Sequence, residues 1–214
     1  MPTALLVEQG AIGRCLHQDG DEVIVEALGA GSWLCSTDSV GDCLGSVWSR
    51  LTLAPTTVLQ LPLATFRSAC DTERWLAAQV LESQARRQQT LLERIAVLRD
   101  RSPARRVAYT LLYLADVAGQ PCPLGGGTRL MLSQHVIAAA ADLARQTTNR
   151  ELRRLHRARV VHVDRGMVCL VDRAMLADVG AGRLHVVPAP RPSACKLRNP
   201  EMTLDCAPLT LRRA

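Results

Sequence analysis

Short apolar runs separated by turn residues occupy the first 70 residues of the chain. Two of these runs, residues 12–17 and 23–28, flank a turn that contains Asp19-Gly20, and an Asp-Gly pair in this position is a strong hairpin signal. Residues 48–53 and 58–61 have the same apolar character. The pattern therefore predicts a small antiparallel sheet or a partial barrel in this part of the chain.

From residue 71 the pattern changes to one long helix that reaches residue 100 and contains neither glycine nor proline. Six of its residues follow alternating steps of three and four, as in a coiled-coil seam: Leu81, Gln84, Gln88, Leu91, Ile95 and Leu98. The two glutamines weaken the apolar burial, but polar seam residues can fix the register of a parallel pair. We therefore expect a homodimer, with an ordinary amphipathic helix packed on its own domain as the alternative.

A second helix begins at Ser102-Pro103, because serine is a favoured N-cap and proline suits the first helical position. Gly119 ends this helix. Residues 120–128 contain several helix breakers and no periodic pattern, so they are expected to form a loop or a small hairpin.

Two shorter helices joined by a tight turn follow, and this arrangement is typical of a helix-turn-helix. Ser133 is the expected cap of the first helix, and Asp142 interrupts it before a second helix that begins near Ala144. The second helix turns Thr148, Leu152 and Leu155 inward. Its opposite stripe is basic and rich in amides, with Gln146, Asn149, Arg150, Arg153 and Arg157.

Residues 160–163 and 167–171 then predict a two-stranded wing around a turn at residues 164–166. A wing beside a basic helix commonly lies against the DNA backbone. The alternative is a solvated basic helix beside a structural hairpin.

The net charge of +6 conceals an asymmetry along the chain. Residues 1–70 carry three basic residues against seven acidic ones, whereas residues 71–214 carry 23 against 13. The second part is therefore the part that should meet a polyanion. No apolar run is long enough to cross a bilayer, and the start does not read as a signal peptide, so we expect a cytoplasmic protein without a membrane partner.

The eight cysteines have irregular spacings and no C-x-x-C pair, which predicts neither a zinc ribbon nor a disulfide scaffold. We expect most of them to be reduced, partly buried thiols. The five histidines are dispersed and form no recognisable nucleophile or metal motif, so the sequence does not predict an enzyme or a bound metal.

The stretch from Leu132 to Leu155 resembles the helix-turn-helix of the Crp/Fnr family of bacterial transcription regulators. The order of β-roll, long helix, linker helix and winged helix-turn-helix is similar to that family from residue 5 to residue 176. The resemblance implies an α+β fold with a sensor-like roll at 1–70, a dimerisation helix at 71–100, a DNA-binding domain at 101–187 and a disordered tail at 188–214. It also implies a homodimer on palindromic double-stranded DNA, with RNA polymerase as a further candidate partner.

By the family's pattern, Arg145 and Arg150 fall at positions that read base edges. Gln146 stands where family members often have glutamate, and glutamine pairs with adenine rather than with cytosine. The resemblance places Ser133 and Thr147 at phosphate-contacting positions, and we expect further backbone contacts from His135, Asn149 and Arg153. The family's turn glycine is replaced by Asp142, which tolerates a positive φ.

Family members that bind cyclic nucleotides hold the phosphate with a glutamate and an arginine-serine pair. Residues 32–48 contain Asp38 and Asp42 but neither glutamate nor arginine, so we expect no binding of cyclic AMP. Cys35 lies in a context that resembles the haem-ligand cysteine of carbon-monoxide-sensing members, but Thr37 replaces their nearby histidine. No cofactor is therefore predicted, and haem or redox-active thiols remain the weaker alternatives.

The first one or two strands of the family's roll have no counterpart at the start of this chain, which predicts a shortened roll or a start codon that lies upstream. The alternative to a regulator is a dimeric binding or scaffold protein whose helix-turn-helix has lost its affinity for DNA.

Overall fold

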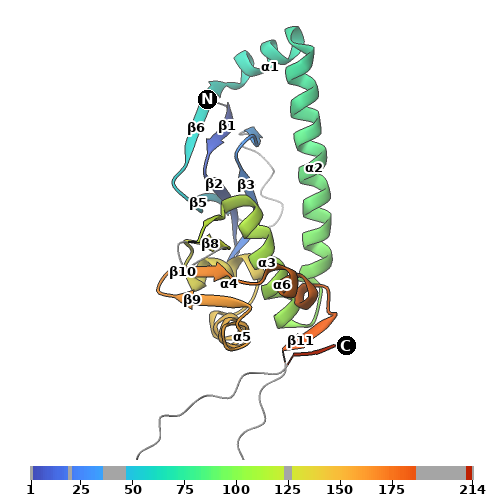
Figure 1. The fold of residues 1–214 in the computed structure, drawn as a ribbon. Helices are drawn as coiled ribbons and strands as arrows, with labels where there is room; N and C mark the ends of the chain where they lie inside the picture. Colours follow the sequence, from blue (N-terminus) through green and yellow to red (C-terminus); the bar gives the residue numbers. More distant parts are fainter. Residues whose placement is uncertain (1, 19–20, 36–46, 123–126, 187–210, 214) are drawn as a thin grey trace, which may run out of the picture.

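The computed structural model describes residues 2–18, 21–35, 47–122, 127–186 and 211–213. Its amino-terminal half contains two three-stranded antiparallel sheets, with strand orders β4-β1-β6 and β3-β2-β5 (Figure 1). The first sheet consists of β1 (Thr3–Gln9), β4 (Trp33–Cys35) and β6 (Thr57–Pro62). The second consists of β2 (Ala11–Gln18), β3 (Asp21–Gly29) and β5 (Val47–Thr52). The predicted antiparallel β-structure is confirmed.

The predicted hairpin is formed by β2 and β3, which pair from Ala11 opposite Gly29 to Gln18 opposite Asp21. The register shifts between Arg14 and Cys15, where one strand gains a residue. The Asp-Gly turn itself, residues 19–20, lies outside the described residues.

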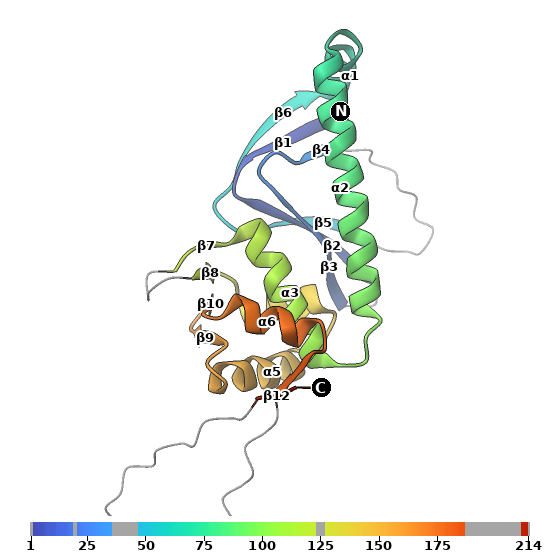
Figure 2. The same cartoon turned by 45° about the vertical axis from the view of Figure 1, so that its right-hand side comes forward.

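The long helix is broken where the sequence predicts continuity. Helix α1 (Leu63–Thr72) is followed by α2 (Arg74–Leu98), because Glu73 between them takes an extended backbone with φ −106° and ψ 91°. The prediction of one helix over 71–100 is therefore wrong at its start. Figures 1 and 2 both show α2 beside the two sheets, with α1 at its amino end and α3 to α6 near its carboxyl end.

Helix α3 (Pro103–Ala118) begins as predicted, because Ser102 caps it by accepting a hydrogen bond from the Arg105 amide. The remaining elements are β7 (Gln120–Pro121), β8 (Thr128–Leu130), α4 (Gln134–Ala141), α5 (Arg145–Arg157), β9 (Val161–Asp164), β10 (Met167–Leu170), α6 (Arg173–Gly180), β11 (Leu184–Val186) and β12 (Leu211–Arg213). Strands β7 and β8 are the small hairpin that was one of the two expectations for residues 120–128.

One hydrophobic core runs through both halves of the molecule. Ile24 and Ala27 of β3 belong to the same buried cluster as Leu111 of α3, Ile137 of α4 and Leu152 of α5. Strand β3 packs directly against α4. The sheet therefore supports the helices that follow it rather than being joined to them by a linker alone.

The expected disordered tail falls mostly outside the described residues, since only residues 211–213 of it are described. These residues form β12, which pairs antiparallel with β11, so the expectation does not hold for this short segment. No helix among the described residues is long and apolar enough to cross a membrane.

One pair of cysteines is an exception to the expectation that most of them are reduced thiols. Cys122 and Cys169 form a disulfide, although 47 residues separate them in the sequence. The sequence does not predict this pair, because the spacing of the two cysteines matches no motif considered above. Folding brings the two cysteines together. Cys15, Cys35 and Cys70 are free thiols, and residues 43, 195 and 206 lie outside the described part of the chain.

Candidate functional site

Helix α4 begins and ends at the residues that the sequence singles out. Ser133 accepts a hydrogen bond from the Val136 amide at 3.3 Å and so caps the helix. Asp142 ends it with a left-handed backbone, φ 49° and ψ 52°, which an aspartate tolerates better than most residues. The tight turn between α4 and α5 is therefore formed without the glycine that family members carry.

Two arginines that the sequence does not single out hold the end of α4. Arg106 of α3 donates to the carbonyls of Ala141 and Asp142 and pairs with the Asp142 carboxylate at 3.0 Å. Arg94 of α2 donates to the carbonyl of Ala140 at 3.0 Å. Cations are favourable at this end of a helix, because the last carbonyls carry the negative end of the helix dipole. Helices α2 and α3 thus fix the position of the helix-turn-helix.

The inner face of α5 is buried as predicted. Thr148 and Leu152 are fully buried, and Leu155 is nearly so. Glu151 lies on this face too, and sequence reasoning missed it. It is 3% exposed and accepts hydrogen bonds from Arg154 at 3.0 and 3.1 Å and from Nε of Arg150 at 3.4 Å. One buried carboxylate therefore helps to orient two basic side chains of the helix.

The outer face of α5 carries the predicted basic stripe. Its exposed members are Arg145, Gln146, Arg150, Arg153 and Arg157, and Thr147 and Asn149 are half-buried beside them. Figure 1 shows α5 at the end of the molecule away from α1. The arrangement can present guanidinium and amide donors to a polyanion over the length of the helix.

His135 lies apart from this stripe. Its Nε2 atom is 3.4 Å from Glu22 Oε2, on the β2–β3 hairpin, although its side chain is still 64% exposed. The same glutamate is 3.9 Å from Nε2 of His17. The structure therefore places His135 at the contact between the β2–β3 hairpin and the first turn of α4, not on the basic stripe of α5.

Strands β9 and β10 form the predicted wing, and Gly166 supplies the positive φ of 69° that its turn requires. The wing is attached to α5, because Nδ1 of His156 accepts a hydrogen bond from the Val163 amide at 3.1 Å. The rings of His156 and His162 lie 5.2 Å apart across this junction.

The predicted seam of α2 divides between two faces. Leu81, Gln88 and Ile95 are exposed, whereas Gln84, Leu91 and Leu98 turn partly toward the protein. Gln84, for example, donates to the Trp33 carbonyl. The exposed apolar stripe continues instead through Leu92, which is 57% exposed. The exposed face therefore keeps positions 81, 88 and 95 of the predicted seam and has positions 85 and 92 in place of 84 and 91.

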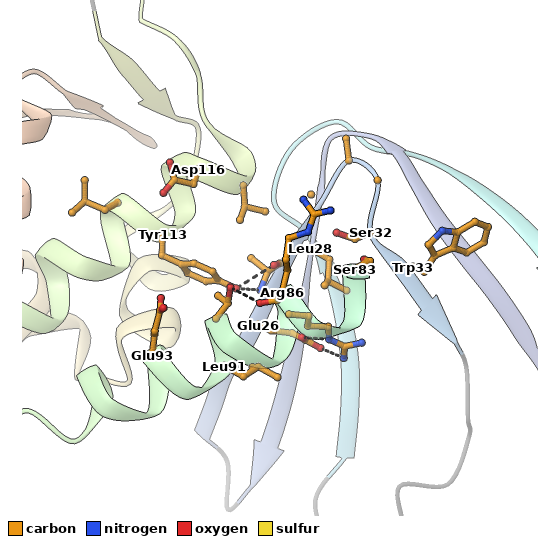
Figure 3. A pocket seen from close by; sticks show the side chains of 18 of the residues that line it. Glu26, Leu28, Ser32, Trp33, Ser83, Arg86, Leu91, Glu93, Tyr113 and Asp116 are labelled. Atoms are coloured by element: carbon orange, nitrogen blue, oxygen red, sulfur yellow. Dashed lines mark hydrogen bonds and ion pairs between the residues drawn. The ribbon is translucent and has the colours of Figure 1, made fainter. Parts of the chain in front are cut away.

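A cavity of about 600 Å³ lies between the β3–β4 turn, α2 and α3. Figure 3 shows Tyr113 reaching from α3 toward β3, with Glu26, Glu93 and Asp116 around the same space. Glu26 is 2% exposed and receives hydrogen bonds from Arg14 and Arg87. The cavity thus has acidic, basic and aromatic walls contributed by the sheet and by both helices.

Cys35, the weak haem candidate, is half-buried at the end of β4. Burial raises the pKa of its thiol above the usual value. Residues 36–46, which follow it, lie outside the described residues, and with them Thr37, Asp38 and Asp42. Within the described part of the chain, no three histidine, cysteine or acidic side chains gather where they could hold a metal ion.

Comparison with known proteins identifies the carboxyl-terminal unit. Residues 105–179 match the family model described as the Crp-like helix-turn-helix domain. This range includes most of α3, both helices of the motif, the wing and most of α6. No curated protein is significantly similar to the chain as a whole.

Several solved structures share this fold at low sequence identity. A transcriptional regulator of the CRP family from Thermus thermophilus is 20% identical, with a TM-score of 0.69 over 84% of this chain and 88% of that one. FixK2 from Bradyrhizobium japonicum is 18% identical, with a TM-score of 0.65 over 83% and 86%. A CooA mutant from Carboxydothermus hydrogenoformans is 20% identical, with a TM-score of 0.64 over 84% and 79%.

The matched domain covers residues 105–179, and the similarity of fold extends over most of the chain. Residues 105–179 therefore form a Crp-like helix-turn-helix domain, and the chain has the fold of solved Crp/Fnr transcription regulators over most of its length.

Proposed function

We propose that the protein binds a palindromic DNA site as a homodimer and reads its sequence through α5. The observation that supports this most directly is the exposed stripe of Arg145, Gln146, Arg150 and Arg153 on a helix whose other face is buried. A helix with this division of faces can enter the major groove while its apolar side stays packed on the protein.

Within this proposal, Arg145 and Arg150 read base edges, since arginine donates two hydrogen bonds to the O6 and N7 atoms of guanine. Gln146 lies between them and pairs with adenine. Nε of Arg150 lies 3.4 Å from the buried Glu151, which limits the directions in which its guanidinium can point. A guanidinium oriented in this way loses less side-chain entropy when it meets a base.

Contacts to the DNA backbone are assigned to Ser133, Thr147, Asn149 and Arg153. Ser133 is exposed at the amino end of α4, where backbone amides attract phosphate. His135 is the least well supported member of the predicted set, because its imidazole lies beside Glu22.

We assign dimerisation to the exposed face of α2 formed by Leu81, Ala85, Gln88, Leu92 and Ile95. These positions repeat in alternating steps of four and three, which is the period of a two-stranded coiled coil. Leu81, Leu92 and Ile95 are each more than half exposed in the single chain. A second copy of the same helix would remove them from water.

Control by cyclic AMP is not part of the proposal. Two arginines reach the cavity beside α2, and both have carboxylate partners: Arg86 pairs with Glu82 at 2.9 Å, and Arg87 pairs with Glu26. An anionic phosphate would have to displace a carboxylate to reach either one. Calorimetric titration with cyclic AMP should therefore show no binding, and a micromolar dissociation constant would contradict this part of the proposal. RNA polymerase remains a candidate partner, to be tested by transcription in vitro.

DNA reading is tested by selecting bound duplexes from a random library with the purified protein. We expect two inverted half-sites whose centres lie about one helical turn apart. Replacing Arg150 with alanine should weaken binding to the selected site by about 1–3 kcal/mol and relax base choice at one position of each half-site. Affinity should also fall steeply with salt, because bound phosphates release counterions.

The matched control is Arg74→Ala, which removes the same charge from an exposed position at the start of α2. This variant should bind the selected site like the unaltered protein. Equal affinity for every duplex before and after Arg150→Ala would contradict the base-reading role. Weak, salt-insensitive binding by a folded dimer would favour the scaffold alternative instead.

A further inference from the structure

The disulfide between Cys122 and Cys169 encloses the DNA-binding motif within one covalent loop. Cys122 directly follows β7, and Cys169 lies in β10, with their Cα atoms 6.2 Å apart. Between them in the sequence lie β8, both helices of the motif and the first wing strand. The two ends of the DNA-binding surface, the cap of α4 and the wing, are thus both attached to elements that this bond joins.

The two sulfur atoms differ in their access to solvent. Cys169 is only 1% exposed. It lies in β10, the strand between β8 and β9, opposite Arg129 on one side and His162 on the other. Cys122 is only half-buried, and its amide donates to the Gly127 carbonyl at 2.9 Å. A small molecule can therefore react with the Cys122 sulfur from solvent. The Cys169 thiol can then attack the Cys122 sulfur from inside the protein.

We propose that Cys122 and Cys169 form a reversible redox switch of the DNA-binding domain. The inference rests on the proposed DNA binding, because a regulator that works on bacterial DNA is surrounded by small thiols, and disulfides in such surroundings are usually transient and redox-sensing. The oxidant is a small-molecule disulfide of the glutathione class.

The chemistry consists of two thiol–disulfide exchanges. The Cys122 thiol loses a proton, and its thiolate attacks one sulfur of the small disulfide, which releases the first small thiolate and leaves a mixed disulfide on Cys122. The Cys169 thiol then loses its proton and attacks the Cys122 sulfur, which releases the second small thiolate. In total, two protein thiols are oxidised to one disulfide while one small disulfide is reduced to two thiols.

The closed bond should favour DNA binding. Strand β8 leads through Leu132 to Ser133, the cap of α4, and β10 carries the wing turn at Gly166. The bond ties the β7–β8 hairpin to β10 and so restricts the movement of these two backbone-contacting parts relative to each other. A surface that is ordered before binding loses less entropy when it binds.

The test compares the full-length protein after equilibration with reduced and with oxidised glutathione. Intact mass measures disulfide formation, and fluorescence anisotropy measures affinity for a mixed-sequence duplex of about 30 base pairs, long enough for two half-sites. We expect the bond to form and open within the range of glutathione ratios found in the cytosol. We expect oxidised protein to bind the duplex about three- to tenfold more tightly.

Cys122→Ser should bind DNA like the reduced protein under both conditions, because its position is half-exposed and the hydroxyl replaces the thiol with little change in volume. Cys70→Ser is the matched control, since this thiol is free and lies outside the DNA-binding domain, and it should still switch. A bond that persists at the most reducing ratio, or never forms at the most oxidising one, contradicts the switch. So does an affinity that is unchanged or lower after oxidation.

The failure of the switch can be told apart from the failure of DNA binding. If neither form binds any duplex, the proposed DNA-binding function fails, whereas the mass measurement still reports whether the bond opens and closes. If both forms bind equally well, DNA binding stands and the switch fails.

Discussion

The guanidinium of Arg94 lies 4.6 Å from the centre of the Tyr113 ring, and both side chains hold the same stretch of β3. Arg94 donates to the carbonyls of Ile24 and Val25, while the Tyr113 hydroxyl bonds to both the amide and the carbonyl of Ala27. Since Arg94 also bonds to the end of α4, one buried cation connects the sheet, α2 and the helix-turn-helix.

Replacing Arg94 with methionine should lower the free energy of unfolding by about 2–4 kcal/mol, because three buried carbonyls lose their donor. Part of the loss is offset, because the substitution also removes a buried charge. Burial disfavours the charged form of this guanidinium and lowers its pKa. Urea unfolding measures the change. The control, Arg86→Met, removes an exposed ion pair with Glu82 and should cost less than about 1 kcal/mol. Equal losses in the two variants would mean that the buried bonds contribute nothing.

Removing the hydroxyl of Tyr113 with Tyr113→Phe should cost about 1–3 kcal/mol, because the Ala27 amide and carbonyl would be left buried without this partner. The same substitution at Tyr109, whose ring stacks beside that of Tyr113, is the matched control and should cost less. Thermal unfolding of both variants provides the comparison. A larger loss at Tyr109 would show that the hydroxyl of Tyr113 is unimportant.

Glutamate in place of Ile95 should convert the proposed dimer to a monomer, because two copies would bring like charges together in an apolar seam. Sedimentation velocity gives the oligomeric state, and circular dichroism shows whether the monomer is folded. Leu59→Glu on β6 is the control, since Leu59 is also an exposed apolar residue, with 42% exposure, but lies away from α2. A dimer that survives the change at Ile95 would exclude this face of α2.

Stability should fall as the pH rises from about 9 to about 11, and Cys15 should contribute to the fall. The pKa of its thiol is raised from 9.0 to about 11, and burial is the largest cause of the increase. In this window the unfolded chain has lost the thiol proton while the folded chain still holds it, so raising the pH favours unfolding. Urea unfolding of Cys15→Ala is compared with that of the unaltered protein at each pH. The comparison isolates the contribution of the thiol, because the tyrosines titrate in both proteins. Parallel curves would rule it out.

Opening the Cys122–Cys169 bond should lower the free energy of unfolding by up to about 4 kcal/mol, the loop-closure value for a loop of this length. Urea unfolding with and without a phosphine reductant measures the loss. Cys122→Ser should show no dependence on the reductant, whereas Cys70→Ser should show the full effect. A loss of the same size in all three proteins would point to an effect of the reductant elsewhere.

Local signals in the sequence predict much of the fold. The cap at Ser133 and the left-handed turn at Asp142 both depend on residues close to them in the chain, and the structure confirms both. The hairpin of β2 and β3 is confirmed for the same reason. The break at Glu73 has no such signal, since neither glycine nor proline marks it.

Features that depend on distant parts of the chain are the ones that sequence reasoning missed. Arg94 is one of several arginines in a charged helix, and only the packing of β3 and α4 against it shows that it is buried. The Cys122–Cys169 pair has no spacing pattern. The exposed apolar face of α2 coincides with only part of the predicted seam, because Leu81, Gln88 and Ile95 fit two neighbouring stripes equally well. The choice between these stripes depends on which face the sheets cover.

The core shared by β3, α3 and α4 limits how this protein can be recombined. A chimera that joined residues 101–187 to another sensor would remove Ile24 and Ala27 from the core and leave Ala140 without its bond to Arg94. The new sensor would have to supply matching side chains on its own strand and helix. The sheet and the helix-turn-helix are therefore expected to be inherited together. Changes in β3 should be accompanied by changes in the helices α3 and α4 that pack against it.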